Sequence, residues 1–216
     1  MECESRTDGR LERGNAKRRA ILDRAVDLAS ISGLDGLSIG KLAAELGISK
    51  SGALLHFGSK LELQLDVITH AAERFGRAVI APAAEQPVGL PRLWYLTDGW
   101  LHHIEIETFP GGCFFSTVGA EFNSRPGRIH DALAKIHNRW SNLLEQQAVA
   151  AREAGQLRPD VVAERLVFEL DALIRHANMH RQLHDSRKVL GHAREAVRDL
   201  LTRVGTEAAV RELFGE

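Results

Sequence analysis

The chain of 216 residues is poor in cysteine, proline and long apolar runs, and each shortage excludes a class of protein. The two cysteines, Cys3 and Cys113, cannot form a disulfide framework, which fits a reducing cytoplasm. No apolar stretch reaches the roughly 18 residues that a membrane span needs, and the polar first residues lack the apolar core of a signal peptide. We therefore expect a soluble cytoplasmic protein that has no contact with a membrane.

Proline contributes only six residues, and no run of alternating apolar and polar residues indicates a β-strand. Leucine, alanine, arginine and glutamate, which all favour helices, are abundant. With 44% hydrophobic and 26% charged residues, the chain can build a packed core over one large or two modest domains. The composition therefore predicts an all-α fold.

The net charge is only −1, but basic residues are concentrated near the N-terminus. Residues 1–60 contain ten Lys or Arg against eight Asp or Glu, whereas residues 61–216 contain eighteen against twenty-one. Phosphate binding depends on such local charge rather than on the total. Lys17, Arg18 and Arg19 are candidate phosphate contacts. Cations near the start of a helix are unfavourable because they oppose the helix dipole, so phosphate binding explains their presence better than helix stability does. The alternative is that these three residues only solvate the start of the helix.

The segment SIGKLAAELGISKSGALLHFGSK, from Ser38 to Lys60, has the pattern of two short helices joined by a tight turn. Ser38 can cap the first helix by accepting a hydrogen bond from one of its free N–H groups. One face of that helix is apolar, at Ile39, Leu42, Ala43 and Leu46. Gly47 follows where the chain must adopt the left-handed conformation, which costs glycine little. This pattern predicts a helix-turn-helix, whose second helix enters the DNA major groove in many regulators.

The second helix of the pair begins after a second cap, Ser49, and is expected to run to about His56. Lys50, Ser51 and Gly52 open this helix, so they are expected near base edges or the DNA backbone, and Gly52 permits close approach. The alternative is a purely structural helix pair, because short helices with a glycine turn are common in all-helical proteins.

The next helix is predicted to start at Lys60, since Ser59 and Glu62 have the spacing of a capping box. The charge of Lys60 opposes the helix dipole in this first turn. A phosphate contact explains a cation at this position better than a structural role does. The helix is expected to continue to about Ala81 and to connect a DNA-binding part to the rest of the chain.

Residues 17–63 resemble the N-terminal DNA-binding domain of the tetracycline-repressor (TetR) family. The residues that agree with the family in order and spacing are Arg18-Arg19, Ala25, Gly33, Leu37-Ser38, Ile39, Leu42-Ala43, Leu46-Gly47-Ile48-Ser49, Lys50, His56-Phe57 and Ser59-Lys60. One departure is Leu54, where the family usually has an aromatic residue, often tyrosine. If that tyrosine gives its hydroxyl to a phosphate, the contact is missing here.

This resemblance implies a DNA-binding domain at residues 1–60, in which residues 1–15 form a disordered or basic arm, and a helical effector-binding and dimerisation domain at residues 61–216. It also implies three partners: a double-stranded operator, a small-molecule effector and a second copy of the chain. With the motif, it gives as candidate DNA contacts Lys17, Arg18, Arg19, Ser38, Ser49, Lys50, Ser51, Gly52, His56 and Lys60.

Beyond Ala81 the chain changes character, and Pro82, Pro87 and Pro91 are expected to bound a loop. Helices are predicted at 89–107, 112–123, 128–155, 160–183, 186–204 and 206–214. Eight of the twelve aromatic residues fall between Trp94 and Trp140, which suits an apolar ligand pocket or, alternatively, a bundle core. As a group, the candidate pocket residues are Trp94, Trp100, His103, Phe114, Phe115 and Trp140.

The last two long predicted helices carry wide apolar stripes that a thin domain cannot bury unless something covers them. In the TetR family the equivalent pair forms a four-helix bundle with a second subunit, and one helix-turn-helix reads only half of an operator. Candidate dimer contacts are Leu166, Leu170, Leu173, Ala177, Val197 and Leu201. The alternative is that both helices pack wholly within one chain.

Three histidines, His176, His180 and His184, repeat at four-residue spacing along one predicted helix face. Such spacing can chelate a metal, but no HExxH motif or cysteine accompanies them and arginines surround them, so we assign no metal site. A partly exposed or dimer-facing stripe is the other interpretation.

The chain contains no nucleophile elbow, phosphate loop or dinucleotide fingerprint, so we expect neither an enzyme nor a cofactor. The sequence favours a ligand-responsive repressor that binds a palindromic operator as a dimer and is released by a small, largely apolar effector. The alternative is a helical interaction protein in which the helix-turn-helix is purely structural.

Overall fold

The computed structural model describes the backbone of residues 3–215 and the side chains of residues 14–53 and 56–215. Within the described backbone all regular structure is helical, apart from one isolated bridge between Leu157 and Gly205. The helices are α1 (Cys3–Ser32), α2 (Ile39–Glu45), α3 (Lys50–Phe57), α4 (Lys60–Phe75), η1 (Gly76–Ile80), α5 (Ala81–Ala84), α6 (Leu90–Glu105), α7 (Phe114–Phe122), α8 (Arg128–Glu153), α9 (Ala163–His184), α10 (Lys188–Val204) and α11 (Glu207–Phe214). The all-α prediction is confirmed.

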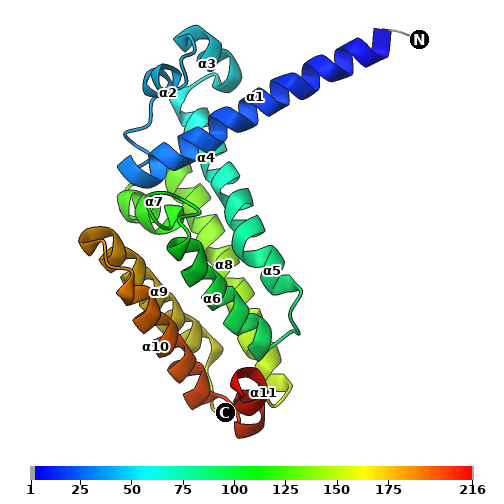
Figure 1. Cartoon of the computed structure of the whole chain (residues 1–216), viewed down its shortest axis with the longest axis vertical. Helices are drawn as coiled ribbons and strands as arrows, with labels where there is room; N and C mark the ends of the chain where they lie inside the picture. Colours follow the sequence, from blue (N-terminus) through cyan, green and yellow to red (C-terminus); the bar gives the residue numbers. More distant parts are fainter. Residues whose placement is uncertain (1–2, 216) are drawn as a thin grey trace.

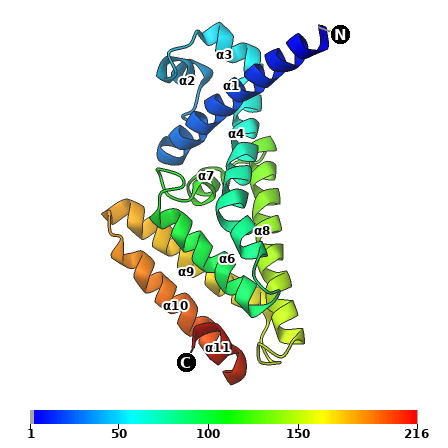
Figure 2. The same cartoon turned by 45° about the vertical axis from the view of Figure 1, so that its right-hand side comes forward.

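The helices form a small head and a longer body (Figure 1). We use "head" for α1, α2 and α3 and "body" for α6 to α11, and α4 runs from one to the other in both views (Figure 2). The expected boundary after residue 60 therefore falls at the first residue of α4, which packs against α1.

The first half of α1 extends away from the rest of the molecule (Figure 1). Residues 1 and 2 of the expected N-terminal arm lie outside the described residues. From Cys3 onward the arm is part of α1, so for residues 3–15 the structure is helical rather than disordered.

The helices of the head are held together by buried apolar residues that are continuous with the core of the body, and those of α2 lie on the face that the sequence pattern predicts. Ile21, Ala25 and Ala29 of α1 are buried, as are Leu42 and Phe57 of α2 and α3. Burying such a side chain stabilises a fold by about 1.5–3 kcal/mol for the larger residues. These contacts hold α2 and α3 in fixed positions on α1 and α4.

The path from Lys60 to Ala84 is one continuous run of helix, because α4, η1 and α5 follow each other without a break. The expectation that a loop begins after Ala81, at Pro82, is wrong. The wider turn of η1 precedes Pro82, and the N–H of Ala81 bonds the carbonyl oxygen of Gly76, five residues back. Proline is tolerated in the first turn of the segment that follows, where its missing N–H has no obligatory partner. The loop is thereby reduced to residues 85–89.

The six helices predicted after residue 89 are all present in the body, with ends that differ by a few residues. Helices α6, α8 and α9 contact one another, α10 packs on α9 and α6, and α11 contacts α10 at the end far from the head (Figure 2). Leu93, Leu101, Leu144 and Leu170 are fully buried between these helices.

Candidate DNA-binding and ligand-binding sites

The helix-turn-helix has the local geometry that its sequence predicts. The hydroxyl of Ser38 accepts a hydrogen bond from the backbone N–H of Lys41 at 3.2 Å, which caps α2. Gly47 has a φ of +62°, and the next residue, Ile48, donates its N–H to the carbonyl of Ala43 at 3.0 Å. Ala43 is buried where α2 and α3 pack together. The turn therefore fixes the direction in which α3 leaves α2.

Helix α3 presents its first residues to solvent and buries the opposite side. Ser49, Lys50 and Ser51 are exposed, whereas Ala53 and Phe57 are buried. A helix that points its N-terminal residues outward in this way can enter a major groove. The candidate His56 is half-buried, and the side chain of Leu54, the departure from the TetR pattern, lies outside the described side chains.

Gly52 has a structural role beside the expected one. Its N–H donates to the hydroxyl of Ser49 at 3.1 Å, so Ser49 caps α3. A Cβ on Gly52 would lie 3.0 Å from the same hydroxyl oxygen. Glycine at this position keeps the cap undisturbed, whether or not DNA approaches it.

The candidate cations fall into two groups. Lys17, Arg19 and Lys50 are exposed and have no ion-pair partner among the described side chains, and Lys41 of α2, which the sequence analysis missed, behaves in the same way. These four residues are free to meet a phosphate. Lys41 lies on the face of α2 opposite the buried residues Ile39, Leu42 and Ala43. This helical spacing is the signal that could have identified Lys41 as an exposed cation.

Arg18 and Lys60 already have protein partners. Arg18 lies 2.5 Å from a carboxylate oxygen of Asp66 and 5.4 Å from the centre of the Phe57 ring, so it ties α1 to α3 and α4. Lys60 donates from Nζ to the backbone carbonyl of Asp35 at 2.7 Å. A phosphate contact was the favoured explanation for a cation at Lys60, but the loop before α2 supplies a structural one.

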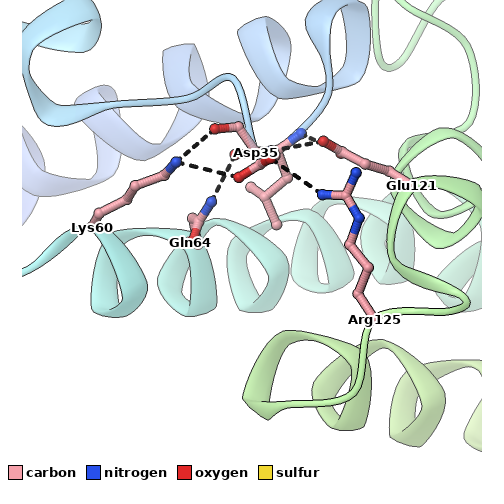
Figure 3. Close-up of polar contacts among 6 residues, drawn as sticks. Asp35, Lys60, Gln64, Glu121 and Arg125 are labelled. Carbon is pink, nitrogen blue, oxygen red and sulfur yellow. Dashed lines mark hydrogen bonds and ion pairs between the residues drawn. The ribbon is translucent and has the colours of Figure 1, made fainter.

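The same loop is held from the side of the body (Figure 3). Glu121 of α7 accepts hydrogen bonds from the backbone N–H groups of Leu34, at 2.7 Å, and Asp35, at 2.9 Å. Gly33 precedes them with a φ of +82°, and a Cβ there would lie 2.9 Å from the Glu121 carboxylate. The carboxylate and the loop therefore fit closely together.

Asp35 links the two sides of this junction through its own carboxylate (Figure 3). One oxygen lies 3.4 Å from Lys60 Nζ and the other 3.2 Å from Nη1 of Arg125, in the loop after α7. The hydrogen bond from Lys60, and then the charge of Lys60, lower the pKa of Asp35 below its ordinary value, with help from Arg125. Gln64 of α4 adds a hydrogen bond from Nε2 to the carbonyl of Leu34 at 2.8 Å.

A cavity of about 930 Å³ lies in the body between α4, α7, α8 and α9. This volume falls within the range of small-molecule sites, roughly 300–1,000 Å³. Its wall is rich in aromatic side chains that meet edge to face, with ring centres 5.1 Å apart for Phe75 and Trp140 and 5.3 Å apart for Trp100 and Trp140. Phe115 of α7 continues the wall, 5.9 Å from Phe75.

Three of the six predicted pocket residues, Trp100, Phe115 and Trp140, line this cavity. Trp94 lies elsewhere, because its ring packs edge to face on Phe214 of α11 at 5.1 Å. Phe114 is fully buried in the core behind the wall. The expectation that these two residues face a ligand therefore does not fit the structure.

His103 is also displaced from the cavity wall. Its ring lies between Phe75, at 5.3 Å, and Phe109, at 5.4 Å, and neither ring nitrogen has a hydrogen-bond partner among the described residues. Burial lowers the pKa of His103 to about 3, and the nearby charge of Arg74 acts in the same direction. His103 is thus a neutral core residue rather than the pocket residue that we expected.

Part of the polar wall of the cavity comes from α9, a helix for which only dimer contacts were expected. Arg175, Asn178 and Gln182 lie three and four residues apart on the side of α9 that lines the cavity. The signal that could have found them is their helical spacing on a face between the apolar stripes.

Five of the six predicted dimer contacts are buried within the single chain. Leu166, Leu170, Ala177, Val197 and Leu201 are at most 3% exposed. They form the most apolar stripes of α9 and α10, which pack into the body's own core. These five residues therefore cannot form a contact between two copies, and only Leu173, which is half-buried, remains available for one.

The exposed apolar side chains of α9 lie on another face. Phe168 is 72% exposed, Leu183 70% and Met179 51%. Met179 and Leu183 belong to the wall of the cavity, whereas Phe168 lies at a groove of about 680 Å³ between α9 and α10, which is also lined by Leu173, His176, Val189 and other residues. We call this surface the α9–α10 face. Large exposed aromatic and aliphatic side chains of this kind commonly mark interaction sites.

The rings of His176, His180 and His184 do follow one another along α9, with centres 6.2 and 4.5 Å apart. Across the described side chains, no group of three or more His, Cys, Asp or Glu residues is arranged to hold a metal ion. Among the helices that the structure describes, none is both long and apolar enough to cross a membrane.

Two family models match the chain, and together they cover the head and most of the body. The model described as "Bacterial regulatory proteins, tetR family" matches residues 21–67. The model described as "Tetracyclin repressor-like, C-terminal domain" matches residues 89–197, just over half of the chain. No protein with a curated description matches the sequence significantly.

Solved structures share the fold over almost the whole length. A TetR transcriptional regulator from Chloroflexus aurantiacus has a TM-score of 0.80 and 23% identity, over 90% of this chain and 98% of the other. A TetR-family regulator from Cytophaga hutchinsonii has a TM-score of 0.77 and 16% identity, over 89% and 96%. A regulator from Saccharomonospora viridis, solved in complex with choline, has a TM-score of 0.74 and 21% identity, over 89% and 100%.

These identities establish a common fold, and the family models add the sequence signature. The members of this family are DNA-binding transcriptional regulators, not enzymes. The chain belongs to the tetracycline-repressor (TetR) family.

Proposed function

We propose that this regulator is a ligand-responsive repressor, which binds a palindromic operator in the cytoplasm as a homodimer and is released by a small, largely apolar effector. The observation that carries the proposal is the double role of α7. Phe115 and Ser116 of this helix line the cavity, while Glu121 of the same helix holds the loop of the head. A molecule in the cavity would therefore touch an element that positions the DNA-binding head.

The head, residues 1–60, is the proposed DNA-binding domain. Lys50 and Ser51 would approach the major groove from the exposed start of α3, while Lys17, Arg19 and Lys41 would meet phosphates. The alternative of a purely structural helix-turn-helix leaves this set of exposed and unpaired cations without a purpose.

Residues 61–216 are the proposed sensor and dimerisation domain, and the α9–α10 face is the proposed contact between two copies. Phe168 would leave water there, which stabilises association by roughly 25 cal/mol for each Å² of apolar surface removed. Dimerisation also sets the distance between two recognition helices, which must match successive major grooves about 34–36 Å apart.

Release would follow from a shift of the junction between head and body. Helix α4 runs from the head to the cavity, where Phe75 forms part of the wall, and α7 forms a second link through Glu121. A ligand that binds one arrangement of these helices better than another shifts the population toward it. A changed spacing of the two heads would then weaken operator binding.

The choline complex of the Saccharomonospora regulator makes a quaternary ammonium an obvious candidate effector. Aromatic side chains such as Trp100 and Trp140 can bind such a cation through their ring faces. The basic residues in the wall of this cavity favour a different class of ligand.

Footprinting on the DNA beside the chain's own gene tests the proposed function. We expect protection of a site with two related half-sites, and the protection should weaken as salt is added. Uniform protection without any preferred site, or none at micromolar protein, would contradict it.

A further inference from the structure

We propose that the effector of this cavity is an apolar molecule that ends in a carboxylate or a similar acidic oxygen group, and that Arg175 binds this group. The inference rests on the proposed function, because it names the class of ligand that the sensor takes. It follows from three features of the cavity: the sign of the charge in its wall, the free donors of Arg175, and the apolar surface beside them.

The described wall of the cavity contains basic residues but no aspartate or glutamate. Arg175 belongs to this wall on α9, and Arg139 belongs to it on α8, where it is exposed. Two histidines, His130 and His137, contribute from α8 as well. The lining residues therefore offer basic partners to an anion, whereas a cation would find no carboxylate among them.

Arg175 is held in place and still has donors to offer. Its Nε donates to Asp171, one turn earlier on α9, at 2.6 Å, and its guanidinium lies 5.6 Å from the centre of the Trp100 ring. Its two terminal nitrogens have no hydrogen-bond partner among the described residues. Asp171 does not line the cavity. A guanidinium fixed in this way can receive a carboxylate with two parallel hydrogen bonds.

The position of Arg175 also disfavours a quaternary ammonium ligand. Such a cation is bound by the faces of aromatic rings. The guanidinium of Arg175 already occupies the neighbourhood of one face of Trp100, and a second positive charge beside it would be repelled.

The rest of the wall suits an apolar body with few further polar contacts. Phe75, Phe115 and Trp140 provide the apolar surface, and Asn178 and Gln182 continue the polar strip of α9 beyond Arg175. Ser116 of α7 is also in the wall, and its hydroxyl is buried without a hydrogen-bond partner. A small rotation of this hydroxyl would allow it to donate to a ligand oxygen, which would remove the cost of an unpaired buried group.

Three probes with the same ten-carbon chain test the ligand class: decanoate, decan-1-ol and decyltrimethylammonium. Their affinities are measured by isothermal titration calorimetry on the full-length protein without DNA. We expect decanoate to bind about tenfold or more tightly than the ammonium compound, with the alcohol between them. A tenfold difference in affinity equals about 1.4 kcal/mol, which is close to the contribution of one hydrogen bond to a charged group.

Variants of Arg175 locate the acid-binding group. Arg175→Gln should weaken decanoate by about tenfold or more and leave decan-1-ol almost unchanged. Arg211→Gln is the matched control, because Arg211 pairs with Glu207 one turn earlier on α11, at 2.7 Å, far from the cavity. If Arg175→Gln unfolds because Asp171 loses its partner, the double variant Asp171→Asn with Arg175→Gln restores a neutral pair and carries the same expectation.

The inference is overturned if decanoate does not bind, if the ammonium compound binds as tightly as decanoate, or if the neutral variants keep the full decanoate affinity. None of these outcomes bears on DNA binding, because operator affinity is measured on the protein without ligand. A failed ligand class is therefore distinguishable from a failed assignment as a DNA-binding regulator.

Discussion

Glu121 accepts a hydrogen bond from the backbone N–H of Leu34 at 2.7 Å, although 87 positions separate the two residues in the sequence. Glu121 belongs to a helix of the cavity wall, and Leu34 belongs to the loop that leads into the helix-turn-helix. The bond therefore joins the body, which contains the cavity, directly to the head, in addition to the covalent link through α4.

Replacing Glu121 with Ala should uncouple the two parts. The backbone N–H groups of Leu34 and Asp35 lose their charged acceptor, at a cost of about 1–3 kcal/mol, and should exchange their hydrogens faster. Operator affinity without ligand should change little. The loss of operator affinity that about 1 mM decanoate causes should shrink severalfold, and this concentration saturates a site that binds more tightly than millimolar. Fluorescence anisotropy of labelled operator measures both.

Glu212→Ala, on α11, is the control for this experiment, because that exposed carboxylate lies far from the junction. It should keep the wild-type response. A Glu121→Ala variant that responds to ligand as fully as the wild type would show that α4 alone transmits the signal.

Replacing Phe168 with Arg should convert a dimer into monomers, since the side chain is 72% exposed in the single chain and a buried unpaired charge at an interface is costly. Multi-angle light scattering measures the mass. Val88→Arg, in the loop before α6, changes another exposed apolar residue, which is 55% exposed, and should leave the dimer intact.

The buried stripe behaves differently in this test. Val197→Glu should lower the melting temperature rather than dissociate a folded dimer, because Val197 is fully buried inside one chain. A Phe168→Arg variant that remains dimeric would place the interface on another face.

His103 should make the protein less stable in mild acid. Its pKa is lowered to about 3 in the fold, whereas the unfolded chain has the ordinary value of 6.5, so below pH 6.5 the unfolded state binds more protons. The stability that a neutral His103 allows is present above pH 6.5 and is lost progressively as the pH falls toward 3. Between pH 7 and pH 5 this loss amounts to about 2 kcal/mol.

The variant His103→Phe, which cannot bind a proton, should lose correspondingly less stability over the same interval in urea unfolding. The control is His102→Phe, since His102 is its half-exposed neighbour on α6. Equal pH dependence of His103→Phe and wild type would show that His103 is protonated in the fold.

The sequence predicted those features that local residues determine. The caps Ser38 and Ser59 and the left-handed turn at Gly47 depend only on their immediate neighbours, and all three are present. The later helices were also recognised, because glycine and proline mark their ends. Pro82 is the exception, since the π-helical turn before it has no clear signal in the sequence.

Tertiary pairing explains what the sequence could not predict. The contact between Lys60 and Asp35 joins a helix start to a distant loop, so the lysine looked free to bind phosphate. The most apolar stripe of α9 packs into the chain's own core, so the stripe chosen for the dimer was the wrong one. Arg175 was passed over because a charged residue on an amphipathic helix ordinarily faces solvent.

The central claim is that the exposed start of α3 and the free cations of the head bind DNA, and salt-dependent operator binding of two lysine variants tests it most directly. Lys50 is exposed and unpaired, so Lys50→Ala should weaken binding at low salt and lower the slope of log affinity against log salt by about one unit. Lys60→Ala is the matched comparison, and its slope should stay close to that of the wild type because Lys60 is engaged with Asp35. Equal slopes for Lys50→Ala and wild type, or an operator affinity of the wild type that does not fall with salt, would contradict the account.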